Sequence, residues 1–94
     1  MPSDLTPARR SELRAQAHKL SPVVLIGDKG LTDEVVAEID RSLKAHELIK
    51  VRALLERDDR EVAFKALCER TGAEAVQHIG KIFILYRKRD AETR

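Results

Sequence analysis

The sequence contains few of the residues on which many functional sites depend. Its 94 residues include two phenylalanines, one tyrosine, no tryptophan and one cysteine. A single cysteine, Cys68, cannot form an internal disulfide, which suits a reducing compartment. So few aromatic side chains cannot build a base-stacking surface like that of an RRM domain. No apolar run approaches the roughly 20 residues that cross a bilayer, and the amino terminus lacks a signal-peptide pattern, so we expect a cytoplasmic protein.

Patterns typical of catalytic and metal sites are also missing. The histidines His18, His46 and His78 do not show H-x-x-x-H spacing, and Cys68 has no C-x-x-C partner, so no zinc site is expected. Cys68 fits helix packing better than nucleophilic chemistry. His46 ends a predicted helix, where a cation suits the helix dipole. No Walker A or dinucleotide fingerprint follows the glycines, so we predict a non-catalytic protein without a cofactor.

Charge is distributed unevenly along a chain whose length fits one domain. The net charge is only +2. Residues 6–20 and 81–94 each carry an excess of basic side chains, whereas residues 58–74 carry an excess of acidic ones. A folded chain with this asymmetry can present one basic face, which suits a polyanion such as RNA.

The apolar pattern predicts a two-layer α/β fold with the order α-β-α-β-α-β-β. Thr6-Pro7 suits a helix start, and Gly72 suits a helix end. The predicted helices begin near residues 6, 32 and 58, and the predicted strands cover residues 23–26, 48–54, 75–79 and 81–87. Strands separated by helices should be parallel, and the last two should form an antiparallel hairpin, which gives a four-stranded mixed sheet. The domain core should span about residues 5–88, followed by a polar tail at 89–94.

Several local features carry more specific predictions. The apolar run at 23–26 is typical of a strand buried on both faces. Thr32 should cap the second helix, and the segment 58–61 resembles a capping box. Three sets of apolar residues should form the buried stripes of the helices: Leu13, Ala17 and Leu20; Val35, Val36, Ile39 and Leu43; and Val62, Ala63, Ala66 and Leu67.

A Gly-x-x-Gly segment, Gly27-Asp28-Lys29-Gly30, lies between the first predicted strand and the second helix. Two glycines allow a sharp turn and a close approach of a ligand to the main chain. The helix that follows offers unpaired N–H groups, and Lys29 adds a positive charge, so the segment suits phosphate. KH domains clamp nucleic-acid backbone with a similar loop. The carboxylates of Asp28, Asp33 and Glu34 oppose phosphate unless they point away.

Further basic residues are candidate RNA contacts. Lys50 and Arg52 are two positions apart on a strand and therefore share a face, opposite Ile49, Val51 and Ala53. Lys81 and Arg87 lie at the two ends of the last predicted strand, also on a common face, and Lys19 follows the first helix. The alternative is that these are ordinary solvated side chains. Tyr86 and Phe64 fit packing better than base stacking.

Four blocks of the sequence resemble the CRM domain, the chloroplast RNA splicing and ribosome maturation module, in its stand-alone bacterial YhbY form. They are the segment 17–24, the segment 26–32, the segment 46–51, and Ile79-Gly80-Lys81 with Leu85-Tyr86-Arg87. The resemblance covers roughly residues 5–88. It implies a fold similar to the C-terminal domain of translation initiation factor three, with RNA bound by the G-x-x-G loop and by Lys50, Lys81 and Arg87. Asp28 departs from the family, in which that position is often polar or basic.

Two functional hypotheses follow. In the first, a monomeric, non-catalytic assembly factor binds precursor ribosomal RNA of the large subunit, with which bacterial members of the family associate. In the second, the chain is a protein-interaction module. It would use the acidic third helix, with Asp58, Asp59 and Glu61, or an exposed sheet edge to bind a ribosomal protein or a nuclease.

Overall fold

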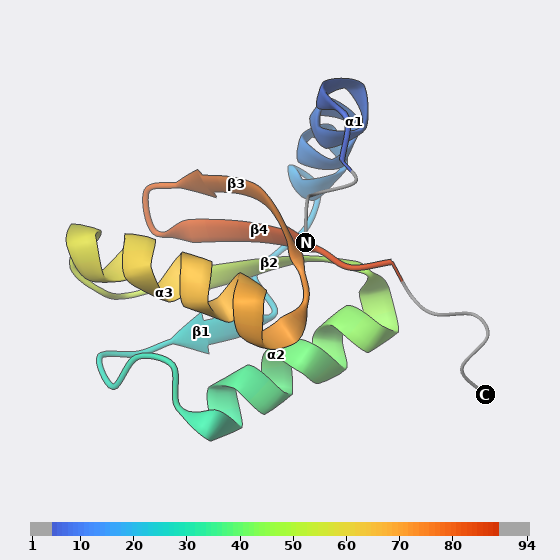
Figure 1. The fold of residues 1–94 in the computed structure, drawn as a ribbon. Helices are drawn as coiled ribbons and strands as arrows, with labels where there is room; N and C mark the ends of the chain where they lie inside the picture. Colours follow the sequence, from blue (N-terminus) through green and yellow to red (C-terminus); the bar gives the residue numbers. More distant parts are fainter. Residues whose placement is uncertain (1–4, 89–94) are drawn as a thin grey trace.

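The computed structural model describes residues 5–88, which fold in the predicted order α-β-α-β-α-β-β (Figure 1). Among these residues, no helix is long and apolar enough to cross a membrane. The helices and strands of this part of the chain are α1 (Pro7–Ala17), β1 (Val24–Ile26), α2 (Asp33–His46), β2 (Leu48–Ala53), α3 (Arg57–Thr71), β3 (Glu74–Ile79) and β4 (Ile82–Tyr86).

The strands of residues 5–88 form a four-stranded mixed sheet in the order β1-β2-β4-β3. β1 pairs with β2 in parallel, and β4 pairs with both β2 and β3 in antiparallel fashion. The mixed sheet and the final hairpin are therefore confirmed. The order also shows that β4 lies between β2 and β3, so β1 and β3 are the two edge strands.

One face of the sheet is covered by α2 and α3, which lie together, whereas α1 stands apart from them (Figure 1). Alternate residues of β2, such as Ile49 and Val51, enter the core beneath the two helices, as their spacing predicted. The largest fully buried side chains of this core are Ile26, Ile39, Leu43, Ile49, Val51, Leu67, Phe83 and Leu85.

Helix α1 packs on the opposite face of the sheet and covers one end of it. Leu13 and Ala17 are buried against Leu48, Val76 and Ile84. The prediction that Leu20 continues this stripe is wrong. The helix ends at Ala17, and Leu20 is 38% exposed.

The predicted caps are confirmed at three helix ends. The hydroxyl of Thr6 accepts a hydrogen bond from the N–H of Arg9, and that of Thr32 accepts one from the N–H of Val35, each at 3.1 Å. Gly72 ends α3 in the left-handed conformation, with a φ of 73°.

The predicted start of α3 is wrong in detail. The helix begins at Arg57, and its N-cap residue Glu56 makes no side-chain capping bond, so the segment 58–61 is not a capping box. Val62 is 71% exposed, because the buried stripe of α3 consists of Ala63, Leu67 and Thr71, at a spacing of four.

The prediction that both faces of β1 are buried is also wrong. Val24 and Ile26 lie in the core, but Leu25 between them is 53% exposed. β1 is an edge strand, and α2 covers one of its faces, whereas Leu25 on the other face stays exposed. The continuous apolar run at 23–26 therefore forms a strand with one buried face and one exposed face, and both faces are apolar.

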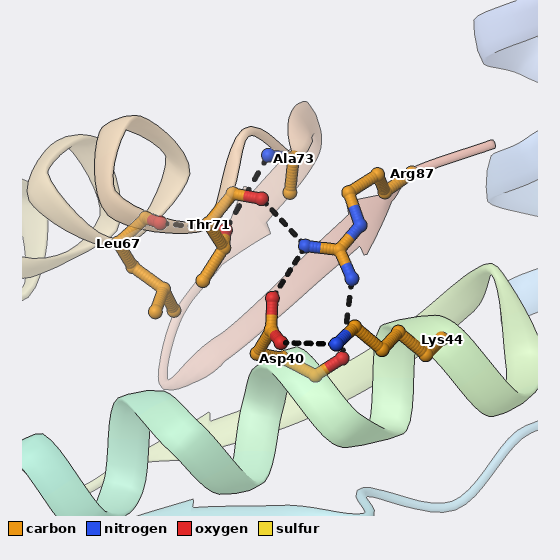
Figure 2. Close-up of polar contacts among 6 residues, drawn as sticks. All are labelled: Asp40, Lys44, Leu67, Thr71, Ala73 and Arg87. Carbon is orange, nitrogen blue, oxygen red and sulfur yellow. Dashed lines mark hydrogen bonds and ion pairs between the residues drawn. The ribbon is translucent and has the colours of Figure 1, made fainter. Parts of the chain in front are cut away.

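Arg87 joins the carboxyl end of β4 to both helices of the covered face (Figure 2). Its Nη1 donates to Asp40 Oδ1 at 2.7 Å and to the carbonyl oxygen of Thr71 at 2.6 Å. Its Nη2 donates to the carbonyl oxygen of Asp40 at 3.2 Å. The hydrogen bonds from Arg87, assisted by Lys44, lower the pKa of Asp40 below its ordinary value, against a smaller opposing effect of burial.

We expect Arg87→Ala to lower the free energy of unfolding by about 1–2 kcal/mol, because charged hydrogen bonds to α2 and α3 are lost from a half-buried site. For a domain of this size, the midpoint of thermal unfolding should fall by roughly 4–15 °C, measured by circular dichroism. Arg70→Ala is the matched control. It removes an exposed ion pair to Asp33 and should change the midpoint little.

The difference between wild type and Arg87→Ala should depend on pH. A carboxyl group whose pKa is lowered by folding contributes stability that is present above its unfolded pKa of about 4 and is lost as pH falls through its folded pKa. The difference should therefore stay constant from about pH 7 to 5 and shrink below about pH 4. A difference that is unchanged at acid pH would contradict the assignment to Asp40.

Candidate nucleic-acid interface

The Gly-x-x-Gly segment forms a tight turn between β1 and α2. The N–H of Gly30 donates to the carbonyl oxygen of Gly27 at 3.0 Å, which places Asp28 and Lys29 at the exposed corners. The N–H of Thr32 then donates to the carbonyl oxygen of Gly30, also at 3.0 Å, and Thr32 caps α2. The turn thus leads directly into a helix amino terminus.

The two glycines of the turn differ in what the fold requires of them. Gly30 has a φ of +75°, a conformation that other residues adopt only with strain. Gly27 does not have a positive φ, and a Cβ atom built on it would meet no atom within 4 Å. Neither the backbone conformation nor the neighbouring atoms of the described residues therefore require a glycine at position 27.

The turn, the β3–β4 connection and the start of α3 all lie at one end of the sheet (Figure 1). Two hydrogen bonds at the end of β2 hold this arrangement. The N–H of Leu54 donates to the carbonyl oxygen of Ile26 at 2.8 Å, and the N–H of Ala53 donates to the carbonyl oxygen of Lys81 at 2.7 Å. Since Ile26 immediately precedes the glycine turn, Lys81 and the turn flank the same strand end.

The sheet face opposite α2 and α3 is open at this same end. The register places one row of residues across all strands of the described sheet, in the order Leu25, Arg52, Ile82, Ile79. Lys50 lies in the next row, paired with Ile84. We call residues Leu25, Arg52, Ile82 and Ile79 the open row. Helix α1 packs against the rest of this face, around Leu48, Val76 and Ile84, and Ile82 of the open row lies at the edge of this cluster.

The structure brings together most of the residues that the sequence indicated, but not all of them. Lys29, Arg52 and Lys81 are exposed at the loop end, and Lys50 is half-buried one row behind Arg52. Lys19 is exposed in the turn after α1, which lies on the open side of the sheet. Arg87 differs from these residues, because its guanidinium is held by Asp40 and Thr71.

The acidic side chains near the turn differ in whether a basic side chain balances their charge. Asp33 Oδ1 accepts a hydrogen bond from Arg70 Nη2 at 3.0 Å, so its charge is partly balanced by α3. Asp28 is exposed at the corner of the turn beside Lys29. Asp28 is therefore the carboxylate that a phosphate at the turn would meet most directly.

A groove of about 450 Å³ lies between the end of α1 and the beginning of β2. Its wall is mostly apolar and includes Leu20 and Val23, and its polar or charged residues are Gln16, Ser21, His46 and Lys50. Val23 is bonded through its N–H to the carbonyl oxygen of Lys50 at 2.9 Å, so the groove adjoins the second row of the open face.

Other side chains with reactive or planar groups serve packing. Burial raises the pKa of Cys68 to about 11, reinforced by Glu74 and Glu69, so its thiol stays protonated at neutral pH. The ring of Phe64 lies 5.3 Å from that of His78 and 4.7 Å from that of Phe83. The packing roles expected for Cys68 and Phe64 therefore fit their surroundings.

Tyr86 is likewise part of the packing beneath α1, and the guanidinium of Arg9 lies 5.5 Å from its ring centre.

Sequence reasoning missed two exposed apolar residues of the open row, Leu25 and Ile79. Strict alternation around the buried Val24 and Ile26 would have placed Leu25 on the open face, but the unbroken apolar run concealed it.

Comparison with known proteins gives consistent relatives. A "Probable RNA-binding protein" of Pseudomonas aeruginosa is 44% identical over 85 residues, which cover 89% of this chain and 82% of that protein. An "RNA-binding protein" of Haemophilus influenzae is 43% identical over 84 residues, which cover 88% and 85%.

A solved structure shows the same fold. The solution structure of a hypothetical protein of Staphylococcus aureus, described as a candidate RNA-binding protein, superposes with a TM-score of 0.82 at 34% identity, and the match covers 95% of this chain and 94% of that one. The model of the CRS1/YhbY (CRM) domain matches residues 5–87. On this match, and on the identity to the two bacterial relatives, the chain belongs to the CRS1/YhbY (CRM) domain family.

Proposed function

We propose that this chain is a non-catalytic RNA-binding protein that holds RNA backbone at the turn 27–30. The observation that carries the proposal is Gly27, a glycine that neither backbone conformation nor crowding requires. A bare main chain at the entrance to a helix suits the close approach of a phosphate. The names of the relatives from Pseudomonas aeruginosa and Haemophilus influenzae support RNA as the ligand.

The basic side chains around the turn would supply most of the charge. Lys29 lies at its corner, and Arg52 and Lys81 lie beside it at the end of the sheet. Lys50 and Lys19 extend the basic surface toward the groove at the end of α1. Lysine and arginine gain affinity for phosphates by releasing counterions. Arg87 is left out of this surface, because its guanidinium is engaged with Asp40 and Thr71.

The RNA that we propose is precursor ribosomal RNA of the large subunit, bound by a monomer during ribosome assembly. The support is the four-block resemblance to bacterial members of the family. Crosslinking in cells followed by sequencing of the bound RNA should recover large-subunit ribosomal RNA. A Lys29→Ala/Lys50→Ala double variant should recover several-fold less, and equal recovery from both would remove the proposed site.

A second candidate is a docking surface for a basic protein. It is favoured by Val62, which is 71% exposed on α3 close to Asp58, Asp59 and Glu61. Charge reversal at Asp58 and Asp59 would then disrupt partner binding, while changes in the turn would leave it intact. The opposite pattern in pull-down experiments favours the RNA site.

Gly27→Ala is the sharpest test of the turn. Its side chain meets no atom of the protein, so the midpoint of thermal unfolding should stay the same or rise slightly. RNA affinity should fall about tenfold, because the methyl group occupies the space that the phosphate would use. Filter binding and thermal melts measure the two effects.

Gly72→Ala is the matched control. Its φ of +73° makes alanine costly, by about 1 kcal/mol, but Gly72 lies at the carboxyl end of α3 and is not part of the turn. This variant should therefore lose stability and keep RNA affinity. If Gly27→Ala binds RNA as tightly as wild type, the turn is not the phosphate site.

Charge at the corners of the turn should act in opposite directions. Lys29→Ala should weaken binding and reduce the dependence of log K on log salt by about 0.7, the value for one phosphate contact on a single strand. Asp28→Asn should tighten binding a few-fold at low salt, because it removes a carboxylate that repels phosphate. Identical salt slopes for wild type and Lys29→Ala would contradict a phosphate contact at Lys29.

A further inference from the structure

The open row combines apolar exposure with positive charge in a way that backbone binding alone does not require. Leu25 is 53% exposed and Ile79 is 56% exposed, and Ile82 between the edge strands is half-buried. Arg52 lies in the same row, between Leu25 and Ile82. A surface that served only to attract phosphates would gain nothing from aliphatic side chains at these positions.

The strand register makes the open row one continuous strip of residues across the sheet. Leu25 pairs with Arg52, Arg52 with Ile82, and Ile82 with Ile79, so the strip crosses every strand of the described sheet. At about 4.8 Å between neighbouring strands, it is about 14 Å long. Helix α1 leaves the two ends of the strip exposed, at Leu25 and Ile79. In the middle of the strip, Ile82 packs against the edge of the cluster that α1 forms with Leu48, Val76 and Ile84.

The place of the strip indicates what covers it. Its β1 end is Leu25, two residues before Gly27, and its β3 end is Ile79, two residues before Lys81. RNA whose phosphates lie at the turn and at Lys81 would therefore carry its bases over the strip. Bases paired in an A-form duplex are not accessible from their faces, whereas unpaired bases can splay out onto a protein surface.

We propose that the open row is a platform for unpaired nucleobases, and that the RNA bound by this protein is single-stranded where it crosses the sheet. This inference rests on the proposed RNA-binding function and specifies the ligand of the same surface. The faces of bases are apolar enough to pack on leucine and isoleucine, and the guanidinium of Arg52 can stack on a base within the row. Aliphatic groups thus take the place of aromatic rings, of which this sequence has only three.

Fluorescence anisotropy with three RNAs tests the proposal on the wild-type protein. The RNAs are a short single strand, the same strand with abasic sites at its centre, and a blunt duplex of equal length. We expect the single strand to bind about 5- to 20-fold more tightly than the abasic strand, although both carry the same phosphates. Equal affinity for the two strands, or tighter binding of the duplex, would overturn the platform.

A Leu25→Ser/Ile79→Ser double variant tests the residues themselves. It should lose about 5- to 20-fold in affinity for the single strand and almost none for the abasic strand. Val62→Ser is the matched control, because Val62 is a more exposed aliphatic residue on α3, and it should bind both strands as wild type does. Leu25→Met keeps the apolar surface and should keep the affinity. Equal losses of the double variant on both strands would exclude base contact.

The outcomes also separate this inference from the function on which it rests. If wild type binds no RNA, or if Lys29→Ala does not weaken binding, the proposed function itself fails. If binding is salt-dependent and sensitive to Lys29 but indifferent to the presence of bases, only the platform fails. The remaining alternative is that the strip is a contact between copies of the chain, which sedimentation of wild type and the double variant tests. If wild type is a dimer, the double variant is a monomer and RNA binding is unchanged, the strip is such a contact and the platform fails.

Discussion

The burial of one sheet face beneath α2 and α3 is the constraint on which the rest of the structure depends. Side chains alternate along a strand, so residues such as Val51 and Phe83 can enter this core only if their neighbours point the other way. Arg52 and Ile82 are those neighbours, and the pairing of β2 with β4 places them opposite each other. The open row is thus a direct consequence of the core, and a slip of one residue in register would destroy both.

Much of this arrangement could be predicted from the sequence, because it depends on local patterns. The alternation of Ile49, Lys50 and Val51 placed β2 correctly, and Thr32 and Gly72 marked helix ends. The sequence could not show that β4 lies between β2 and β3, or that α1 covers only part of the second face. For this reason the exposure of Leu25 was missed, since it depends on which elements pack over an edge strand.

Arg87 illustrates the same limit for the candidate site. Its position near the end of a strand suggested a solvated contact on the face of Lys81, but its partners Asp40 and Thr71 lie 47 and 16 residues away in sequence. No local pattern reports such a contact. The pairing also gives Arg87 a role that lysine would fill poorly, since one planar guanidinium donates both to a carboxylate and to main-chain carbonyl oxygens. A basic residue in a chain of this family can therefore be structural.

The two parts of the proposed surface differ in the physics of their contribution. The turn and its lysines would act through charge, which falls with salt and does not distinguish one RNA sequence from another. The open row would act through contact with base faces, which is less sensitive to salt and requires that the RNA be unpaired. Because Leu25 lies on β1 and Gly27 begins the turn two residues later, the two parts are held close together. This link would select RNA in which the backbone fits the turn and the adjacent bases are unpaired and can unstack. The selection would then depend on the local structure of the RNA, with little need for base-specific hydrogen bonds.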